Sequence, residues 1–134
     1  MKQRSLALFI LLAFAIAAWA REDRLTNTGL NPAAEGKVTT ENDRNGNTKV
    51  EVEVKHMAMP QALTPAKQSY VVWVQPRGKE PEPLGGLRVN DELEGSLKAS
   101  TPYKDFDIFV TAEDKPNPDV PSGMVILKGT VERK

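Results

Sequence analysis

The chain has 134 residues, with 18 Lys plus Arg against 18 Asp plus Glu, so its formal charge is zero. Such a balance provides no basic excess for binding phosphate backbones, and we expect no nucleic-acid partner. The sequence contains no cysteine, which excludes disulfides, thiol nucleophiles and lipid attachment through a lipobox cysteine. The length accommodates one ordinary domain plus an export segment.

The first twenty residues have the pattern of a cleavable secretion signal. Lys2 and Arg4 precede an uncharged stretch over residues 5–18, and the Ala-Trp-Ala at 18–20 supplies an A-x-A cleavage site. The apolar stretch is about fifteen residues long, whereas a membrane-spanning helix needs roughly 20. We therefore predict a signal peptide at 1–20, a periplasmic or secreted location, and no stable membrane span after cleavage. A retained signal anchor is the alternative.

Residues 21–34 are polar and contain Asn27, Gly29, Asn31 and Pro32 without a periodic apolar pattern, so they are predicted to be a flexible lead-in. From residue 35 onward the apolar residues recur with period two, which indicates β-strands.

The clearest strand is 49–55, in which Val50, Val52 and Val54 share one face and charged residues occupy the other. The preceding Asn-Asp-Arg-Asn-Gly-Asn at 42–47 favours a hairpin turn, which makes 36–41 the partner strand.

Four further segments complete the predicted strands. The continuously apolar run 69–75 predicts a central strand that is buried on both faces. Residues 84–89 and 93–99 are predicted to pair with each other around Asn90-Asp91. In 105–112 the side chains of Phe106, Ile108 and Val110 are expected to point inward, and 123–131 is the last strand. About seven short strands separated by prolines predict an immunoglobulin-like β-sandwich over residues 35–134.

Several motifs in this region follow one another in an order that resembles a known family. They are YVVWV at 70–74, PLGGL at 83–87, FDIFVTAE at 106–113 and PSGMVIL at 121–127. This order resembles the extracytoplasmic C-terminal domain of anti-sigma-K-type anti-sigma factors. The resemblance covers about half of the predicted mature chain and implies an all-β sensor-like domain outside the cytoplasm.

Those anti-sigma factors place a cytoplasmic sigma-binding domain ahead of a membrane helix. Here only residues 1–5 precede the apolar segment, so the resemblance does not carry sigma inhibition over to this sequence.

Two segments contain residue types that bind metals. His56, Met57 and Met59 combine one imidazole with two thioethers, as copper(I) sites do, although strand alternation places His56 and Met57 on opposite sides. Core packing of the two methionines is the favoured interpretation. The acidic segment 113–119 resembles a calcium loop only in composition, because two prolines and Lys115 interrupt it. No metal and no cofactor are predicted.

Catalytic motifs are absent from the sequence, which has a single histidine and no G-x-S-x-G elbow, so we expect no enzyme. Asp105 and Asp107 share a strand face, where solvated charge is the ordinary interpretation. Phe109 and Trp73 lie on the faces opposite their apolar neighbours and form a candidate contact patch if both are exposed. Burial is favoured for Trp73, and the position of Phe109 stays open.

These observations predict a non-catalytic binding or sensing module of the bacterial envelope, whose partner is an unidentified protein or envelope ligand. One alternative is a small periplasmic copper-handling protein that uses His56, Met57 and Met59. Another is an accessory domain that binds carbohydrate through exposed aromatic side chains.

Overall fold

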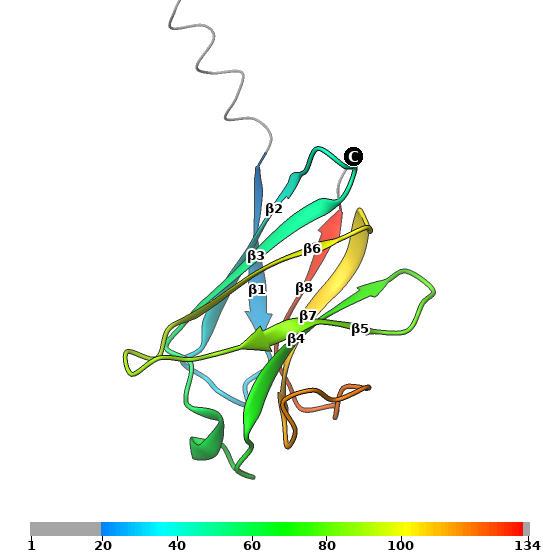
Figure 1. Cartoon of the computed structure of the whole chain (residues 1–134). Coiled ribbons are helices and arrows are strands. Elements are labelled where there is room, and N and C mark those ends of the chain that lie inside the picture. Colours follow the sequence, from blue (N-terminus) through cyan, green and yellow to red (C-terminus); the bar gives the residue numbers. More distant parts are fainter. Residues whose placement is uncertain (1–19, 133–134) are drawn as a thin grey trace, which may run out of the picture.

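The computed structural model describes residues 20–132, which form eight strands and one short 3-10 helix (Figure 1). The predicted signal peptide lies outside the described residues except for Ala20. Within residues 20–132 there is no helix of the length and apolar character that a membrane crossing requires. The elements are β1 (Arg21–Asn27), β2 (Glu35–Asn42), β3 (Thr48–Lys55), η1 (Pro60–Ala62), β4 (Ser69–Pro76), β5 (Glu82–Leu87), β6 (Gly95–Thr101), β7 (Asp105–Glu113) and β8 (Val125–Glu132).

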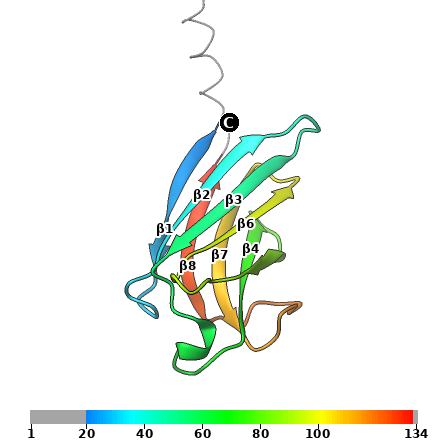
Figure 2. The same ribbon diagram turned by 60° about the vertical axis from the view of Figure 1, so that its left-hand side comes forward.

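The eight strands form one antiparallel sheet in the order β5-β4-β7-β8-β1-β2-β3-β6. Figure 2 shows β1, β2, β3 and β6 in front of β8, β7 and β4. The two outermost strands meet through side-chain contact, because a methyl group added to Gly85 of β5 would lie 3.1 Å from the Leu97 Cδ1 of β6. The sheet is therefore curled almost into a barrel, with the core between its front and back.

The all-β expectation is confirmed, but the strand count and the N-terminal boundary differ from it. Arg21–Asn27 is strand β1, so the prediction of a flexible lead-in is wrong for these residues. The first part of β1 pairs with β2 and its last two residues pair with β8. The close approach of β1 to β8 depends on Gly129 of β8, because a Cβ there would lie 2.8 Å from the Cδ2 of the buried Leu25 of β1. One buried leucine among charged residues is too weak a pattern to predict a strand.

The core consists of the inward-facing side chains of the strands. Every residue of β4 from Tyr70 to Val74 is buried, which confirms the prediction that this strand is covered on both faces. Phe106, Ile108 and Val110 of β7 are also buried, as predicted. The Tyr70 hydroxyl donates to the Ala58 carbonyl over 2.6 Å, and burial raises the pKa of Tyr70 to about 12. Burial disfavours the charged phenolate, so the hydroxyl stays the donor of this hydrogen bond even at alkaline pH.

The hairpin between β2 and β3 is confirmed. The Asp43 Oδ1 accepts hydrogen bonds from the backbone N–H groups of Asn45 and Asn47, both over 2.8 Å, and Gly46 has φ +81°. An aspartate that bonds to the backbone two residues ahead and a glycine with positive φ are the local requirements of such a turn. These local bonds account for the polar residues of the turn sequence.

The predicted pairing of 84–89 with 93–99 is wrong. The turn that begins at Asn90 does form, because its Oδ1 accepts from the N–H groups of Glu92 and Glu94. However, β5 pairs with β4 and β6 pairs with β3, and the backbone pairing between the two segments is limited to the Val89–Gly95 bridge in the described residues. The two strands therefore form the opposite ends of the strand order of the sheet.

Thr40 and Thr48 provide a matched test of buried polar groups in the core. Both side chains are fully buried; the Thr40 hydroxyl has no hydrogen-bond partner among residues 20–132, whereas the Thr48 hydroxyl donates to the Tyr103 carbonyl over 2.8 Å. We expect Thr40→Val to raise the free energy of unfolding by about 1 kcal/mol and Thr48→Val to lower it by about 1 kcal/mol. Chemical denaturation measures both free-energy changes. Two changes of the same sign would contradict the difference in hydrogen bonding between the Thr40 and Thr48 hydroxyls.

Candidate functional site

The most promising concave surface lies on the outer face of β1, β8, β7 and β4. It is a shallow, open groove of about 620 Å³ whose floor is formed by strands in the middle of the sheet. The residues that line the groove with polar, charged or aromatic side chains are Phe109, Lys128, Asp107, Thr130, Gln75, Thr26 and Arg24. Two rows of side chains cross the strands here, one aromatic and basic, the other polar.

The first row follows the strand register. Trp73 is the partner of Phe109, Phe109 is the partner of Lys128, and Lys128 is the partner of Thr26. Trp73 and Phe109 are stacked with their ring centroids 6.5 Å apart and their planes at 16°. Trp73 is fully buried, whereas Phe109 is half-buried and lines the groove. The favoured burial of Trp73 is confirmed, so Phe109 is the one member of the predicted contact patch that is accessible, and its role in contact stays a prediction.

The second row lies two residues further along the strands. Gln75 is the partner of Asp107, and Asp107 is the partner of Thr130, whose hydroxyl donates to the Asp107 Oδ1 over 2.9 Å. Arg24 of β1 also lines the groove. Side chains two residues apart on a strand point to the same face and are separated by about 7 Å. A ligand lying over Phe109 can therefore also contact the polar row.

A chain of hydrogen bonds holds Trp73 in place. Its Nε1 donates to the Thr111 Oγ1 over 2.8 Å, and that hydroxyl donates to the Glu113 Oε2. The same carboxylate oxygen accepts from the Ser122 N–H over 3.0 Å. Glu113 is only 4% exposed, so its hydrogen bonds satisfy a buried carboxyl group and join β7 to the loop before β8.

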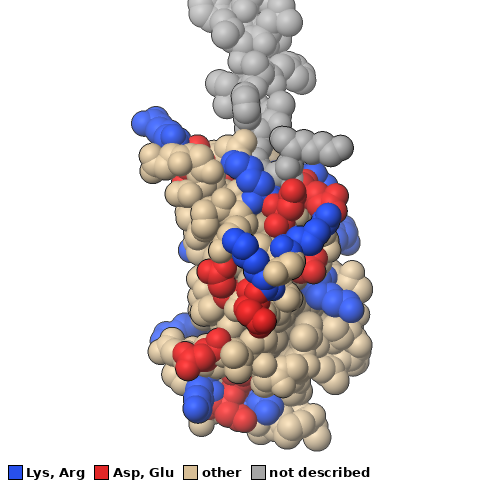
Figure 3. Space-filling view, turned by 90° about the vertical axis from the view of Figure 1, so that its right-hand side faces the viewer, with Lys and Arg blue, Asp and Glu red and all other residues tan. Residues whose placement is uncertain are grey.

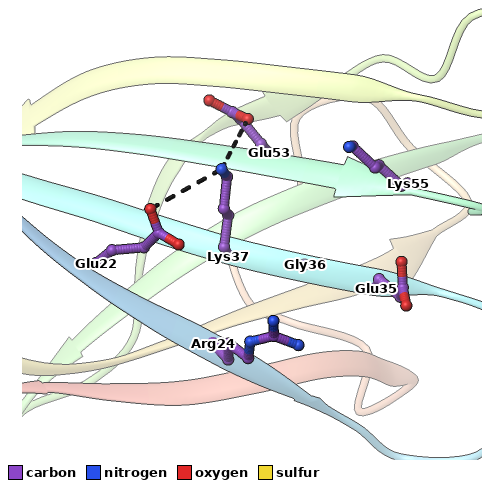
Figure 4. A pocket seen from close by; sticks show the side chains of 7 residues that line it. All are labelled: Glu22, Arg24, Glu35, Gly36, Lys37, Glu53 and Lys55. Carbon is purple, nitrogen blue, oxygen red and sulfur yellow. Dashed lines mark ion pairs between the residues drawn. The ribbon is translucent and has the colours of Figure 1, made fainter.

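A second hollow, of about 250 Å³, lies on the outer face of β1, β2 and β3. Figure 4 shows the Lys37 ammonium between two carboxylates, 3.9 Å from the Glu22 Oε2 and 3.7 Å from the Glu53 Oε2, with Arg24 apart from this trio. These side chains are strongly exposed, and such pairs contribute little to stability. On the face seen in Figure 3, acidic and basic side chains are likewise interspersed. This hollow presents balanced charge and no aromatic side chain.

The candidate copper ligands do not converge. Met57 is fully buried in the core, whereas the His56 side chain is exposed and its Nε2 lies 3.9 Å from the Glu35 Oε2. Met59 is partly buried just before η1. Within residues 20–132 no group of three or more His, Cys, Asp and Glu side chains is arranged to hold a metal ion. No observation in the described part of the chain favours a copper site.

The acidic segment 113–119 does not act as one cluster. Glu113 is directed into the hydrogen-bonded chain with Thr111 and Ser122, while the Asp114 Oδ2 lies 3.3 Å from the Lys67 Nζ. The carboxylates at its start thus have separate partners within the protein.

Sequence reasoning found Phe109 but missed its neighbours. Phe109 is recognised because strand alternation places it opposite three inward-facing residues. Arg24 and Thr26 were assigned to the lead-in, and Lys128 and Gln75 carried no local signal. The strand register brings these residues together from β1, β4 and β8.

Comparison with known proteins found no family model that matches this chain and no curated protein with significant similarity to it.

Proposed function

We propose that the chain is an exported, non-catalytic binding module of the bacterial envelope. In this proposal β2 to β8 are an immunoglobulin-like sandwich, with β2, β3 and β6 in one layer and β5, β4, β7 and β8 in the other, and β1 bridges the layers. The strand order supports this division. The sequence resemblance to the outer domain of anti-sigma factors supports the same compartment and a sensing or binding role.

The groove around Phe109 carries the proposal. Ligand sites combine a concave shape with apolar or aromatic side chains and a few directional polar groups. The groove supplies one half-buried aromatic ring together with amide, hydroxyl, carboxylate and cationic side chains from four strands. The rigid sheet beneath holds these groups in place without requiring a conformational change on binding.

Retention on the envelope tests this role for the groove. Protein purified from cells that express the full chain is mixed with a washed envelope pellet, and Phe109→Leu is expected to lower the retained amount at least about fivefold. Leucine preserves apolar contact with Trp73, so the fold is maintained. Leu93→Ala, at an exposed apolar position in the loop before β6, is the control and should bind normally. Equal retention of Phe109→Leu and the unmodified protein would refute the proposed site.

Export is tested independently of binding. When the full chain is produced in a bacterial host, we expect it in the periplasmic or extracellular fraction with Arg21 as its first residue, because Ala18 and Ala20 occupy the positions that signal peptidase recognises. N-terminal sequencing of the fractionated protein decides this. A protein that remains in the cytoplasmic fraction with Met1 intact would contradict the prediction.

A further inference from the structure

Two cations beside the groove have no partner among the described residues, 20–132. Neither Arg24 nor Lys128 makes an ion pair or a side-chain hydrogen bond among residues 20–132, although both side chains belong to exposed residues that line the groove. Three carboxylates line the hollow on the other side of Arg24 and have other partners: Glu22 and Glu53 lie beside Lys37 (Figure 4), and the Glu35 Oε2 lies 3.9 Å from the His56 Nε2. The two positive charges are therefore available to an anionic ligand.

The cations lie on one side of the groove and the aromatic ring lies on the other. Lys128 is the direct cross-strand partner of Phe109, which places their backbones about 5 Å apart. Arg24 belongs to β1, the strand on the far side of β8. Asp107 and Arg77 also carry charge nearby: Asp107 accepts from Thr130, and Arg77 pairs with Glu132 over 3.2 Å. Two cations, Arg24 and Lys128, stand against one carboxylate, Asp107, in the lining of the groove, so its net charge is positive and is concentrated toward β8 and β1.

The floor of the groove offers side chains rather than free backbone groups. β7 is hydrogen-bonded on one side to β4 and on the other to β8, so an extended peptide cannot add to it as a new strand. A balanced overall charge argues against a nucleic acid. Sugar rings match the lining better, because each ring presents an apolar C–H face that can pack on Phe109 and hydroxyl groups that can bond to Gln75, Asp107 and Thr130.

We propose that this groove binds a saccharide chain that bears carboxylate groups. A sugar ring packs on Phe109, its hydroxyls bond to the polar row, and the carboxylate lies over Lys128 and Arg24. A guanidinium group bonds to a carboxylate through two parallel hydrogen bonds, which makes Arg24 the group that selects for acidic sugars. This inference rests on the proposed function, because it names the ligand class of the same groove.

The test uses oligogalacturonate of six units and the same oligosaccharide after reduction of its carboxylates to primary alcohols. Calorimetric titration of the purified protein is expected to show about tenfold tighter binding of the acidic form, and Arg24→Gln and Lys128→Gln should each reduce this preference. Phe109→Leu should weaken the binding of both oligosaccharides by similar factors. Lys49→Gln, which removes an exposed cation paired with Glu41 on the β3 face, is the control and should leave binding unchanged.

The outcomes separate this inference from the proposed function. Equal affinity for the two oligosaccharides, or tighter binding of the reduced form, would overturn the assignment of an acidic ligand while leaving a binding groove. A preference that survives both Arg24→Gln and Lys128→Gln, or is lost equally in Lys49→Gln, would also overturn it. Binding of neither oligosaccharide, combined with Phe109-dependent retention on the envelope, would reject the acidic saccharide and retain the proposed function. If neither oligosaccharide binds and Phe109→Leu is retained on the envelope as well as the unmodified protein, both the acidic saccharide and the proposed binding groove are rejected.

Discussion

Replacement of Trp73 by alanine is expected to lower the free energy of unfolding by about 4 kcal/mol, the range measured when a large buried aromatic side chain is removed. Trp73 is fully buried and stacks on Phe109. Its removal also leaves the Thr111 hydroxyl without the Nε1 donor that contacts it over 2.8 Å. Loss of ring contact and loss of a buried hydrogen bond act in the same direction, so the effect should be among the largest in the protein.

Chemical denaturation followed by circular dichroism measures this effect; tryptophan fluorescence is unsuitable, because Trp73 is the only tryptophan after the predicted cleavage site. Trp73→Phe retains an aromatic ring but removes the indole donor, and a smaller loss of about 2 kcal/mol is expected. Val120→Ala is the control, because Val120 is 71% exposed. A loss below about 1 kcal/mol for Trp73→Ala would show that the contacts of Trp73 with Phe109 and Thr111 contribute little to stability.

Gly95→Ala is expected to destabilise the fold by about 3 kcal/mol or more, although only one methyl group is added. A Cβ at this position would lie 2.3 Å from the Arg88 carbonyl oxygen and 3.4 Å from the Val54 Cγ2. The first contact is with backbone, which cannot rotate away as a side chain can. Relief requires the loop after β5 to separate from β6 and breaks the Val89–Gly95 bridge.

Gly86→Ala is the matched control for this substitution. Gly86 lies in β5, and a Cβ there would meet only the Tyr70 carbonyl oxygen at 4.0 Å, an ordinary contact distance. We expect its free energy of unfolding to change by less than about 1 kcal/mol, since alanine also reduces the entropy of the unfolded chain. Thermal or chemical unfolding of the two variants should differ clearly. Similar stability of Gly95→Ala and Gly86→Ala would contradict the close packing of β6 against the Arg88 backbone.

The parts of the fold that were predicted correctly depend on short-range information. The β2–β3 hairpin follows from a turn sequence in which Asp43 and Gly46 satisfy local backbone requirements. The central strand β4 follows from an uninterrupted apolar run, and the inward face of β7 follows from alternation. In each case the side chains that determine the element are neighbours in the sequence.

The errors arise where a strand is determined by contacts with distant parts of the chain. β1 contains one buried leucine, and its place depends on β2 on one side and β8 on the other. β5 and β6 follow each other in sequence but pair with β4 and β3, so they lie at the two ends of the strand order of the sheet. Trp73 is a contrasting case at the level of a side chain: its burial was expected from the apolar run of β4 and is confirmed, whereas its stacking partner Phe109 is known only from the pairing of β4 with β7.

The sequence by itself determined that this protein is all-β, that the run 70–74 is buried on both faces, and that no cysteine chemistry is available to it, while it left the exposure of Phe109 open. Only the tertiary structure decided that β1 joins the sheet, and thereby that Arg24 lies in the same groove as Lys128 and Phe109. The physical reason is that a groove on a sheet face is assembled across strands, by hydrogen-bond register between segments far apart in the chain. Periodicity within one strand contains no information about that register.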